Sequence, residues 1–219
     1  MSLMPTIISY YTRNTGYQKE IVHLERSIQT LGLDYQIVGI ESRGSWENNC
    51  CYKPLFILEK LREIKKPILW LDADAILQQK PSLLENLQAD VALFIRPHLP
   101  QDHPSKIASG TLYFRPTLAA EKLLLQWHEE CQKLLTQEET VWDQIGLKNA
   151  FYVSEVCSFS LPETYCAIFD KTQITRQDIV ILHYQASRLL RKEINREVVC
   201  FWQDHMLTQK EREVFSTDY

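Results

Sequence analysis

Hydrophobic and polar positions follow two different periods along the first part of the chain, and the two periods alternate. The apolar residues of 6–11 and 68–71 form short, nearly continuous runs, which are typical of strands buried on both faces. Between these runs, apolar residues from Ile21 to Leu31 recur every three or four positions, which predicts an amphipathic helix that ends at Gly32. The same analysis predicts strands at 6–11, 35–40, 68–72, 90–96, 108–115, 151–159 and 179–184, helices at 17–31, 54–64, 82–87, 118–135 and 140–148, loops at 41–49 and 97–106, and a helical tail at 187–219.

The order of these elements predicts an α/β fold with a mostly parallel sheet flanked by helices. Strands that alternate with helices at this spacing are joined by crossover connections, which place neighbouring strands parallel. Ligands of such sheets bind beyond the carboxyl ends of the strands. The residues at 11–13 and 72–74, which close the first and third strands, are therefore expected at one crevice. Since no repeat, low-complexity segment or linker interrupts the 219 residues, we expect a single domain.

Composition narrows the classes of function. A hydrophobic fraction of 45% and a charged fraction of 24% are ordinary for a globular protein, and a net charge of −4 gives no reason to expect nucleic acid as a partner. No stretch approaches the length of a membrane-spanning helix, although the basic tail leaves peripheral membrane contact open. Because no signal-peptide pattern is present, we expect a cytoplasmic protein. Residues 1–3 are interpreted as an expression scar.

The cysteines show no spacing that indicates metal or redox chemistry. They are Cys50, Cys51, Cys131, Cys157, Cys166 and Cys200. None of them forms a C-x-x-C pair, so neither a zinc site nor a redox motif is indicated. In a cytoplasmic protein we expect them to be reduced and mostly buried.

The apolar run at 68–71 stops on two carboxylates, Asp72 and Asp74, before the sequence becomes apolar again. Side chains two residues apart on an extended segment point to the same face, so the two carboxylates can converge. Two anions at the end of a buried strand are costly unless a cation joins them. Oxygen ligands favour magnesium, calcium or manganese, so the pair predicts a divalent-metal site. Taken alone, the pair also fits a solvated strand end or a helix cap.

Four further segments follow the acidic pair in a specific order. They are Ser109-Gly110-Thr111-Leu112-Tyr113-Phe114, Trp142-Asp143-Gln144, Leu161-Pro162-Glu163-Thr164-Tyr165 and Ile181-Leu182-His183-Tyr184. Together with the D-x-D motif Asp72-Ala73-Asp74, they resemble the GT-A glycosyltransferases, above all glycosyltransferase family 8 and the nucleotide-diphospho-sugar transferases. The resemblance covers residues 5–192. A D-x-D motif alone is a weak signal, whereas the ordered set is a specific one.

The resemblance implies a Rossmann-like GT-A domain with a small antiparallel element near the metal site. It implies transfer of a sugar from a nucleoside-diphosphate sugar, UDP-linked, to an acceptor that can be a saccharide, a lipid-linked glycan or a protein. The metal ligands would be Asp72, Asp74 and His183, and the imidazole favours manganese slightly over magnesium. The residues implied to contact the nucleotide-sugar are Tyr11, Thr12, Arg13, Lys53, Asp72, Ala73, Ser109, Gly110 and Arg188.

The resemblance places Asp143 and Gln144 beside the reacting carbon as the catalytic residues. For transfer with retention, which the resemblance favours, the leaving phosphate assists front-face attack and both residues position donor and acceptor. For inversion, one carboxylate must act as general base, with Asp143 the first candidate and Glu163 the second. Asp143 also fits the first turn of a helix, where a carboxylate favours the dipole.

One departure from the family pattern affects the phosphate site. Family 8 continues from the histidine as H-x-x-G-x-x-K, whereas this chain has Ala186 and Leu189 at the glycine and lysine positions. The lysine therefore cannot be carried over. Arg188 and Arg191 are candidates for a displaced phosphate contact, because arginine binds phosphate with two parallel hydrogen bonds. Both also fit a solvated helix face.

Two other functions remain open from the sequence. Phosphatases of the haloacid dehalogenase type also have an apolar strand ending in D-x-D, with Asp72 then the nucleophile. In those enzymes the motif opens the domain, whereas about seventy residues precede it here, and no G-D-x-x-x-D segment follows. The second alternative is a catalytically inactive protein that binds sugar nucleotides. The six glycines form neither G-x-G-x-x-G nor a Walker A loop, so dehydrogenases and kinases are not indicated.

Overall fold

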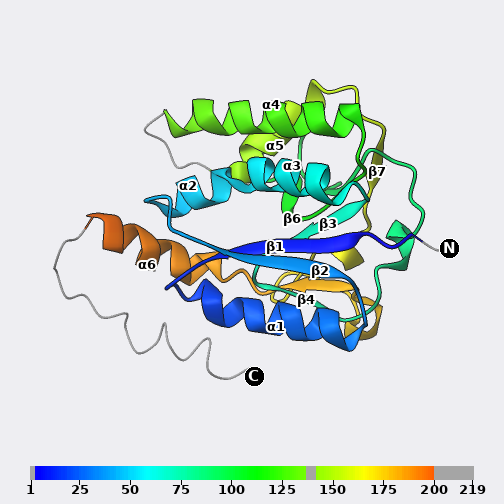
Figure 1. Cartoon of the computed structure of the whole chain (residues 1–219), viewed down its shortest axis with the longest axis horizontal. Helices are drawn as coiled ribbons and strands as arrows, with labels where there is room; N and C mark the ends of the chain where they lie inside the picture. The colour runs from blue at the N-terminus through cyan, green and yellow to red at the C-terminus, as the bar shows by residue number, and fades with distance from the viewer. Residues whose placement is uncertain (1–2, 137–141, 200–219) are drawn as a thin grey trace.

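The computed structural model describes residues 3–136 and 142–199, which form a sheet between two helical layers (Figure 1). One layer is α1, and the other consists of α2, α3, α4 and α5. The strands are β1 (Thr6–Thr12), β2 (Tyr35–Ile40), β3 (Ile68–Leu71), β4 (Ala75–Leu77), β5 (Val91–Ile95), β6 (Ile107–Phe114), β7 (Ser158–Ser160), β8 (Ala167–Ile168) and β9 (Ile181–His183). The helices are α1 (Tyr17–Thr30), α2 (Trp46–Cys51), α3 (Lys53–Ile64), α4 (Leu118–Leu135), α5 (Asp143–Tyr152) and α6 (Ser187–Val199), with short 3₁₀ turns at Ser82–Leu84, Glu163–Tyr165 and Arg176–Asp178.

The main sheet of the described residues has six strands in the order β2-β1-β3-β6-β5-β7. Its strands run parallel except β6, which is antiparallel to both β3 and β5. A second sheet has the order β4-β9-β8, and its β4–β9 pair is antiparallel. The predicted α/β class, mostly parallel sheet and small antiparallel element are confirmed.

The core follows from the two-residue period of the central strands. On β3, Ile68 and Trp70 pack toward α3, α4 and α5, whereas Leu69 and Leu71 pack toward α1 and the second sheet. All four are buried, because helices cover both faces of the sheet. On α1 the predicted stripe contributes Ile21, Leu24 and Ile28 to the second cluster. The continuous apolar runs and the helical period were therefore correct guides to the layers.

The predicted loop at 41–49 is partly wrong, because α2 begins at Trp46. Ser45 caps this helix, since its hydroxyl accepts a hydrogen bond from the Asn48 amide at 3.1 Å. The segment WENNCC is too polar and too short to show a helical apolar period. Tertiary contacts hold it instead: the Trp46 amide donates to Asn195 Oδ1 at 2.8 Å, Glu47 accepts from Arg191, and Cys51 packs into the core.

Three further expectations change along the chain. The strand predicted at 151–159 is wrong over most of its length, because Phe151 and Tyr152 end α5 and only Ser158–Ser160 pairs, with β5. The apolar residues there complete the helix whose Leu147 and Ala150 are buried. The helix predicted at 82–87 is a single 3₁₀ turn. Leu3, assigned to an expression scar, exchanges backbone and side-chain hydrogen bonds with Asn86.

Several predictions extend beyond the described residues. The proposed helix start at Thr140, the tail after Val199, Cys200 and residues 1–2 all lie outside them. The single-domain assignment stays a prediction. The five cysteines of the described residues are free thiols, of which Cys157 is exposed and Cys50 half-buried. Within residues 3–136 and 142–199, no helix has the length and apolar character needed to cross a membrane.

Candidate active site

A cleft of about 860 Å³ opens at the carboxyl ends of β1 and β3. Its walls come from these strand ends, the middle of β6, the loop between β5 and β6, the start of α5 and the face of α6. This is the edge of the sheet where the sequence placed the crevice. The described part of the chain therefore brings segments more than a hundred residues apart around one cavity.

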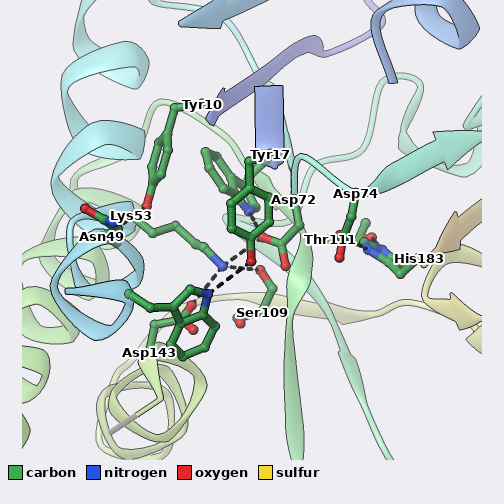
Figure 2. Close-up of polar contacts among 12 residues, drawn as sticks. Tyr10, Tyr17, Asn49, Lys53, Asp72, Asp74, Ser109, Thr111, Asp143 and His183 are labelled. Atoms are coloured by element: carbon green, nitrogen blue, oxygen red, sulfur yellow. Dashed lines mark hydrogen bonds and ion pairs between the residues drawn. The ribbon is translucent and has the colours of Figure 1, made fainter. Parts of the chain in front are cut away.

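Three predicted metal ligands meet on the floor of this cleft. Asp72, Asp74 and His183 each offer one ligand atom, and these atoms lie within 4.8 Å of one another (Figure 2). Asp72 follows β3, and its amide still donates to the Gly110 carbonyl of β6 at 2.9 Å. The carbonyl of Asp74 already accepts from the Tyr184 amide beside β9 at 3.1 Å. The acidic pair thus spans the junction between the two sheets.

The local geometry of the pair differs from the extended segment expected from the sequence. Residues 72–74 form a turn, closed by a hydrogen bond from the Ala75 amide to the Asp72 carbonyl at 3.0 Å. The carboxylates converge because this turn carries the chain from one sheet to the other. Alternation along a single strand is not the cause.

Each of the three ligands has one atom fixed by a neighbour. Asp72 Oδ1 accepts from Lys53 Nζ at 2.8 Å and Trp70 Nε1 at 3.0 Å. Ala186 donates its amide to Asp74 Oδ2 at 2.7 Å, and Thr111 Oγ1 lies 2.8 Å from His183 Nε2. Such outer contacts orient metal ligands and fix the tautomer of a ligating histidine.

The atoms left over from these contacts face one another. Within the described residues, Asp72 Oδ2 and Asp74 Oδ1 accept no hydrogen bond, and Asp74 Oδ1 lies 3.9 Å from His183 Nδ1. Two carboxylate oxygens and an imidazole nitrogen form a donor set that suits manganese or magnesium. The residues present therefore fit a divalent cation.

Gly110 keeps the space beside these ligands open. A Cβ at this position would lie 2.9 Å from His183 Cε1, 3.1 Å from His183 Nδ1 and 3.2 Å from Asp72 Oδ2. Only glycine lets β6 pass so close to the ligands. The register between β5 and β6 shifts at the same level, between Leu93 and Phe94, as a bulge does.

Lys53 is the buried cation of the site. Its side chain is 5% exposed, and Nζ forms ion pairs with Asp72 Oδ1 and Asp143 Oδ2, each at 2.8 Å (Figure 2). Burial opposes the charge of Lys53, but Asp143 and Asp72 outweigh it and raise the pKa of the ammonium above its usual value. Lys53 therefore stays charged and joins the metal-ligand side of the cleft to α5.

The two predicted catalytic residues stand at the first turn of α5. Asp143 is buried, and its backbone carbonyl accepts a hydrogen bond from Trp127 Nε1 of α4 at 2.8 Å. Gln144 Nε2 donates to Ser105 Oγ in the loop between β5 and β6 at 3.3 Å. Both residues line the cleft, with Asp143 oriented by Lys53 and Gln144 by the opposite loop.

The other predicted contacts divide into those inside the cleft and those outside it. Tyr11, Thr12, Lys53, Ala73, Ser109, Gly110 and Arg188 line it. Arg13 does not, since it is exposed and pairs with Glu41 at 3.0 Å. Arg188 forms two hydrogen bonds with Asp170, so its guanidinium already has a carboxylate partner. The second base candidate, Glu163, is exposed and is not among the residues that line the cleft.

The structure adds residues that the motifs did not identify. Tyr17 accepts a hydrogen bond from Trp46 Nε1 at 3.0 Å, and both side chains line the cleft. Burial raises the pKa of Tyr17 well above its usual value, so it remains a neutral phenol. Arg96 also lines the cleft. Tyr17 and Trp46 carried only an aromatic signal in the sequence, and Arg96 lay at the end of a predicted strand without any motif.

No protein-family model and no curated protein matches the sequence of the chain. Its structure is similar to several solved glycosyltransferases. A glycosyltransferase involved in glycosylation of the major capsid of PBCV-1 has a TM-score of 0.64 at 14% identity, over 90% of this chain and all of the other. The galactosyltransferase LgtC, in complex with donor and acceptor sugar analogs, has a TM-score of 0.54 at 10% identity, over 95% of this chain and 99% of LgtC. WbbM, a bifunctional glycosyltransferase, has a TM-score of 0.56 at 13% identity, over 98% of this chain and 51% of WbbM.

The chain has the fold of the GT-A glycosyltransferases. The resemblance first seen in the ordered motifs is thereby confirmed for the fold. At 10–14% identity the likeness concerns the course of the backbone, so the chemistry must be argued from the side chains of the cleft.

Proposed function

We propose that this protein is a cation-dependent glycosyltransferase that transfers a sugar from a nucleoside-diphosphate sugar, UDP-linked, to an acceptor. One observation carries the proposal. Asp72, Asp74 and His183 converge within 4.8 Å, beside a glycine whose missing Cβ keeps the site open. This happens at the carboxyl edge of a sheet that has the glycosyltransferase fold. The ordered motifs of the sequence support the same activity.

Asp72 Oδ2, Asp74 Oδ1 and His183 Nδ1 are the atoms that would hold manganese or magnesium. A bound divalent cation would neutralise the charge that develops on the diphosphate as it leaves. With Nδ1 as the ligand, Nε2 of His183 carries its proton toward Thr111 Oγ1. The imidazole favours manganese slightly over magnesium.

The donor would lie along the floor of the cleft. Tyr11 and Thr12, at the end of β1, line the cleft and would contact the base and the ribose. Ser109 and Gly110 leave room for the sugar on the β6 side, since Gly110 has no side chain. Arg188 would contact a phosphate only by releasing Asp170, which makes it an exchangeable contact.

We propose transfer with retention. The acceptor hydroxyl oxygen bonds to the anomeric carbon on the face from which the diphosphate departs, and its proton passes to the departing phosphate oxygen. Asp143 Oδ2 is occupied by the ammonium of Lys53, so this carboxylate is held to orient a sugar hydroxyl. Gln144, which donates to Ser105 in the loop between β5 and β6, would position the acceptor hydroxyl beside the departing diphosphate.

The two alternatives receive less support. The shared fold is that of glycosyltransferases, which gives no support to a phosphatase with Asp72 as its nucleophile. A protein that binds sugar nucleotides without turnover would use the same floor of the cleft. An intact ligand set with its outer contacts favours a working site. Cytoplasmic location and the nature of the acceptor stay predictions.

The test replaces Asp74 by asparagine. Asp74→Asn keeps an oxygen that accepts from the Ala186 amide, but it removes the carboxylate charge that would ligate the cation. In calorimetry, UDP should bind the wild-type protein far more tightly with Mn²⁺ than without it. The variant should lose this Mn²⁺-dependent gain while it keeps its unfolding temperature.

Asp90→Asn is the matched control. Asp90 is also a buried carboxylate, but it binds Thr117 and the Cys157 amide outside the cleft. This variant should keep the Mn²⁺-dependent gain in UDP affinity. An unchanged gain in Asp74→Asn would refute the cation assignment. Mn²⁺-dependent UDP-sugar binding with neither transfer nor hydrolysis would identify the inactive binding protein.

A further inference from the structure

Arg96 differs from the other arginines that line the cleft. Arg188 pairs with Asp170 and Arg191 pairs with Glu47, whereas Arg96 has no carboxylate within ion-pairing distance among the described residues. Its guanidinium donates to the Ser105 carbonyl and has further N–H groups to offer. Arg96 is half-buried, and this burial lowers its pKa, which Cys166 and Glu163 only partly oppose. An anion bound beside Arg96 would offset the cost of this partial burial.

The loop around Arg96 is held in a defined shape. Lys106 Nζ donates to the carbonyls of Arg96 and Leu99 at 2.8 and 2.6 Å, which ties the two ends of the loop together. His103 Nδ1 accepts from the Ser105 amide at 3.0 Å, so the neutral ring carries its proton on Nε2. His103 lines the cleft as well. Both side chains therefore offer hydrogen-bond donors to the cavity, and neither offers an acceptor.

The position of Arg96 associates it with the acceptor end of the cleft. Ser105, which accepts from Arg96 through its carbonyl, also accepts from Gln144 through its hydroxyl. Gln144 is the residue proposed to position the acceptor. The arginines of α6 that line the cleft, Arg188 and Arg191, pair with Asp170 and Glu47 and form no hydrogen bond with this loop within the described residues. Lys171 and Lys192 also lack ion pairs within the described residues, but both are exposed, where water solvates an unpaired charge.

We propose that Arg96 and the Nε2–H of His103 form an oxyanion subsite for a negatively charged acceptor, a saccharide that carries a carboxylate or a phosphate group. This rests on the proposed glycosyltransferase function and adds the chemical class of the acceptor. A guanidinium with free N–H groups binds carboxylate or phosphate through paired hydrogen bonds. The anion would then supply the charge that Arg96 lacks in the described structure.

The experiment measures the binding of three matched sugars to protein saturated with UDP and Mn²⁺. Glucose is the neutral probe, glucuronate carries a carboxylate and glucose 6-phosphate carries a phosphate. Saturation with UDP prevents the phosphate probe from occupying the donor site. By titration calorimetry, at least one charged sugar should bind about ten-fold more tightly than glucose, and the stronger of the two identifies the anion.

Arg96→Gln should remove this preference and leave the dissociation constant of UDP unchanged. Arg96→Lys, which keeps the charge, should retain part of it. Lys148→Gln is the matched control, because Lys148 Nζ binds the Asp102 carbonyl of the same loop from outside the cleft. It should retain the full preference, and the melting temperatures of all three variants report whether the loop still folds.

Equal affinity of wild-type protein for the three sugars would overturn the proposal. So would an Arg96→Gln variant that keeps the charge preference, or one that weakens UDP binding instead, because Arg96 would then serve the donor phosphates. The underlying function fails in a different way. If UDP does not bind in the presence of Mn²⁺, the glycosyltransferase assignment and the acceptor subsite fall together.

Discussion

The floor of the cleft and its rim carry the same kinds of charged group but hold them differently. On the floor, Lys53 is buried between Asp72 and Asp143. On the rim, Arg188 of α6 pairs with Asp170, and each of these side chains is 37% exposed. The floor is fixed by strand ends and the start of α5, whereas the rim depends on long side chains that reach across loops.

The site is therefore rigid on its floor and able to exchange partners at its rim. A buried charge that loses its partner is left uncompensated, at a cost of about 3–5 kcal/mol. An exposed ion pair contributes about 0–1 kcal/mol, because water and salt screen it. The floor therefore keeps its geometry when the cleft is empty, and the rim is free to rearrange around a ligand.

The largest effect is expected when Lys53 is replaced by methionine. The variant leaves Asp143 buried without its cation. Its free energy of unfolding, measured by urea denaturation, should therefore fall by about 3–5 kcal/mol. The rim counterpart, Arg188→Met, should cost no more than about 1 kcal/mol. Adding Asp143→Asn to Lys53→Met should recover part of the loss. Equal losses in the two single variants would remove the distinction between floor and rim.

A smaller effect is expected for Gly110→Ala, which alters the floor without changing any charge. The added Cβ approaches His183 Cε1 at 2.9 Å, so the imidazole must shift away from the two carboxylates. Mn²⁺ affinity, measured by calorimetry, should fall by about 10- to 100-fold, as when a metal ligand loses its orientation.

The matched control for this glycine is Gly146→Ala. Its Cβ would lie 3.0 Å from Cys131 Sγ in the core between α4 and α5, away from the ligands. That variant should lower the melting temperature but leave Mn²⁺ affinity unchanged. If Gly110→Ala bound Mn²⁺ as tightly as wild type, the close passage of β6 would have no part in the site.

The smallest effect concerns the rim pair between α2 and α6. Burial works against the charge of Glu47, but hydrogen bonds from its own backbone, Asn195 and Arg191 outweigh it and lower its pKa. The pair of Glu47 and Arg191 therefore stabilises the fold at a pH above the usual pKa of a glutamate. This stabilisation is lost as the pH falls through the lowered pKa of Glu47. The free energy of unfolding of the wild type should exceed that of Glu47→Gln by about 1 kcal/mol near neutral pH. The gap measured in urea should begin to narrow below about pH 4 and should close once the pH is below the lowered pKa of Glu47.

A gap of the same size at both pH values would contradict this origin. Trp46 gives an independent signal, because Arg191 lies over its ring at 5.1 Å from the centroid. Its fluorescence should change in wild type over the acid range in which the gap closes. The pair between α2 and α6 would then be a part of the cleft that responds to acid through Glu47.

The same division explains how much the sequence could predict. The strand ends were accessible from periodicity, and the acidic pair, Gly110 and His183 from ordered motifs. Lys53 was predicted to contact the donor, yet its two partners follow it by 19 and 90 residues, and no local pattern links them. Only the packing of α3 against the ends of β3 and α5 brings the three together.

The failures occurred where tertiary contacts override local pattern. The polar helix α2 has no apolar stripe, and its contacts with Asn195 and Arg191 come from nearly 150 residues away. The apolar residues at 151–153 were assigned to a strand because a short apolar run fits either element. Arg96 could not be predicted for a related reason. What distinguishes it is that no carboxylate of the described residues pairs with it, and the sequence does not show which residues lie close together in space.

The junction of the two sheets has a mechanical consequence. Asp72 belongs to the hydrogen-bond ladder of the main sheet, whereas Asp74 and His183 belong to the small one. A cation bound by all three residues would link the hydrogen-bond ladders of the two sheets at one point. Backbone amides along β9 should then exchange with deuterium more slowly when Mn²⁺ is added in the absence of nucleotide.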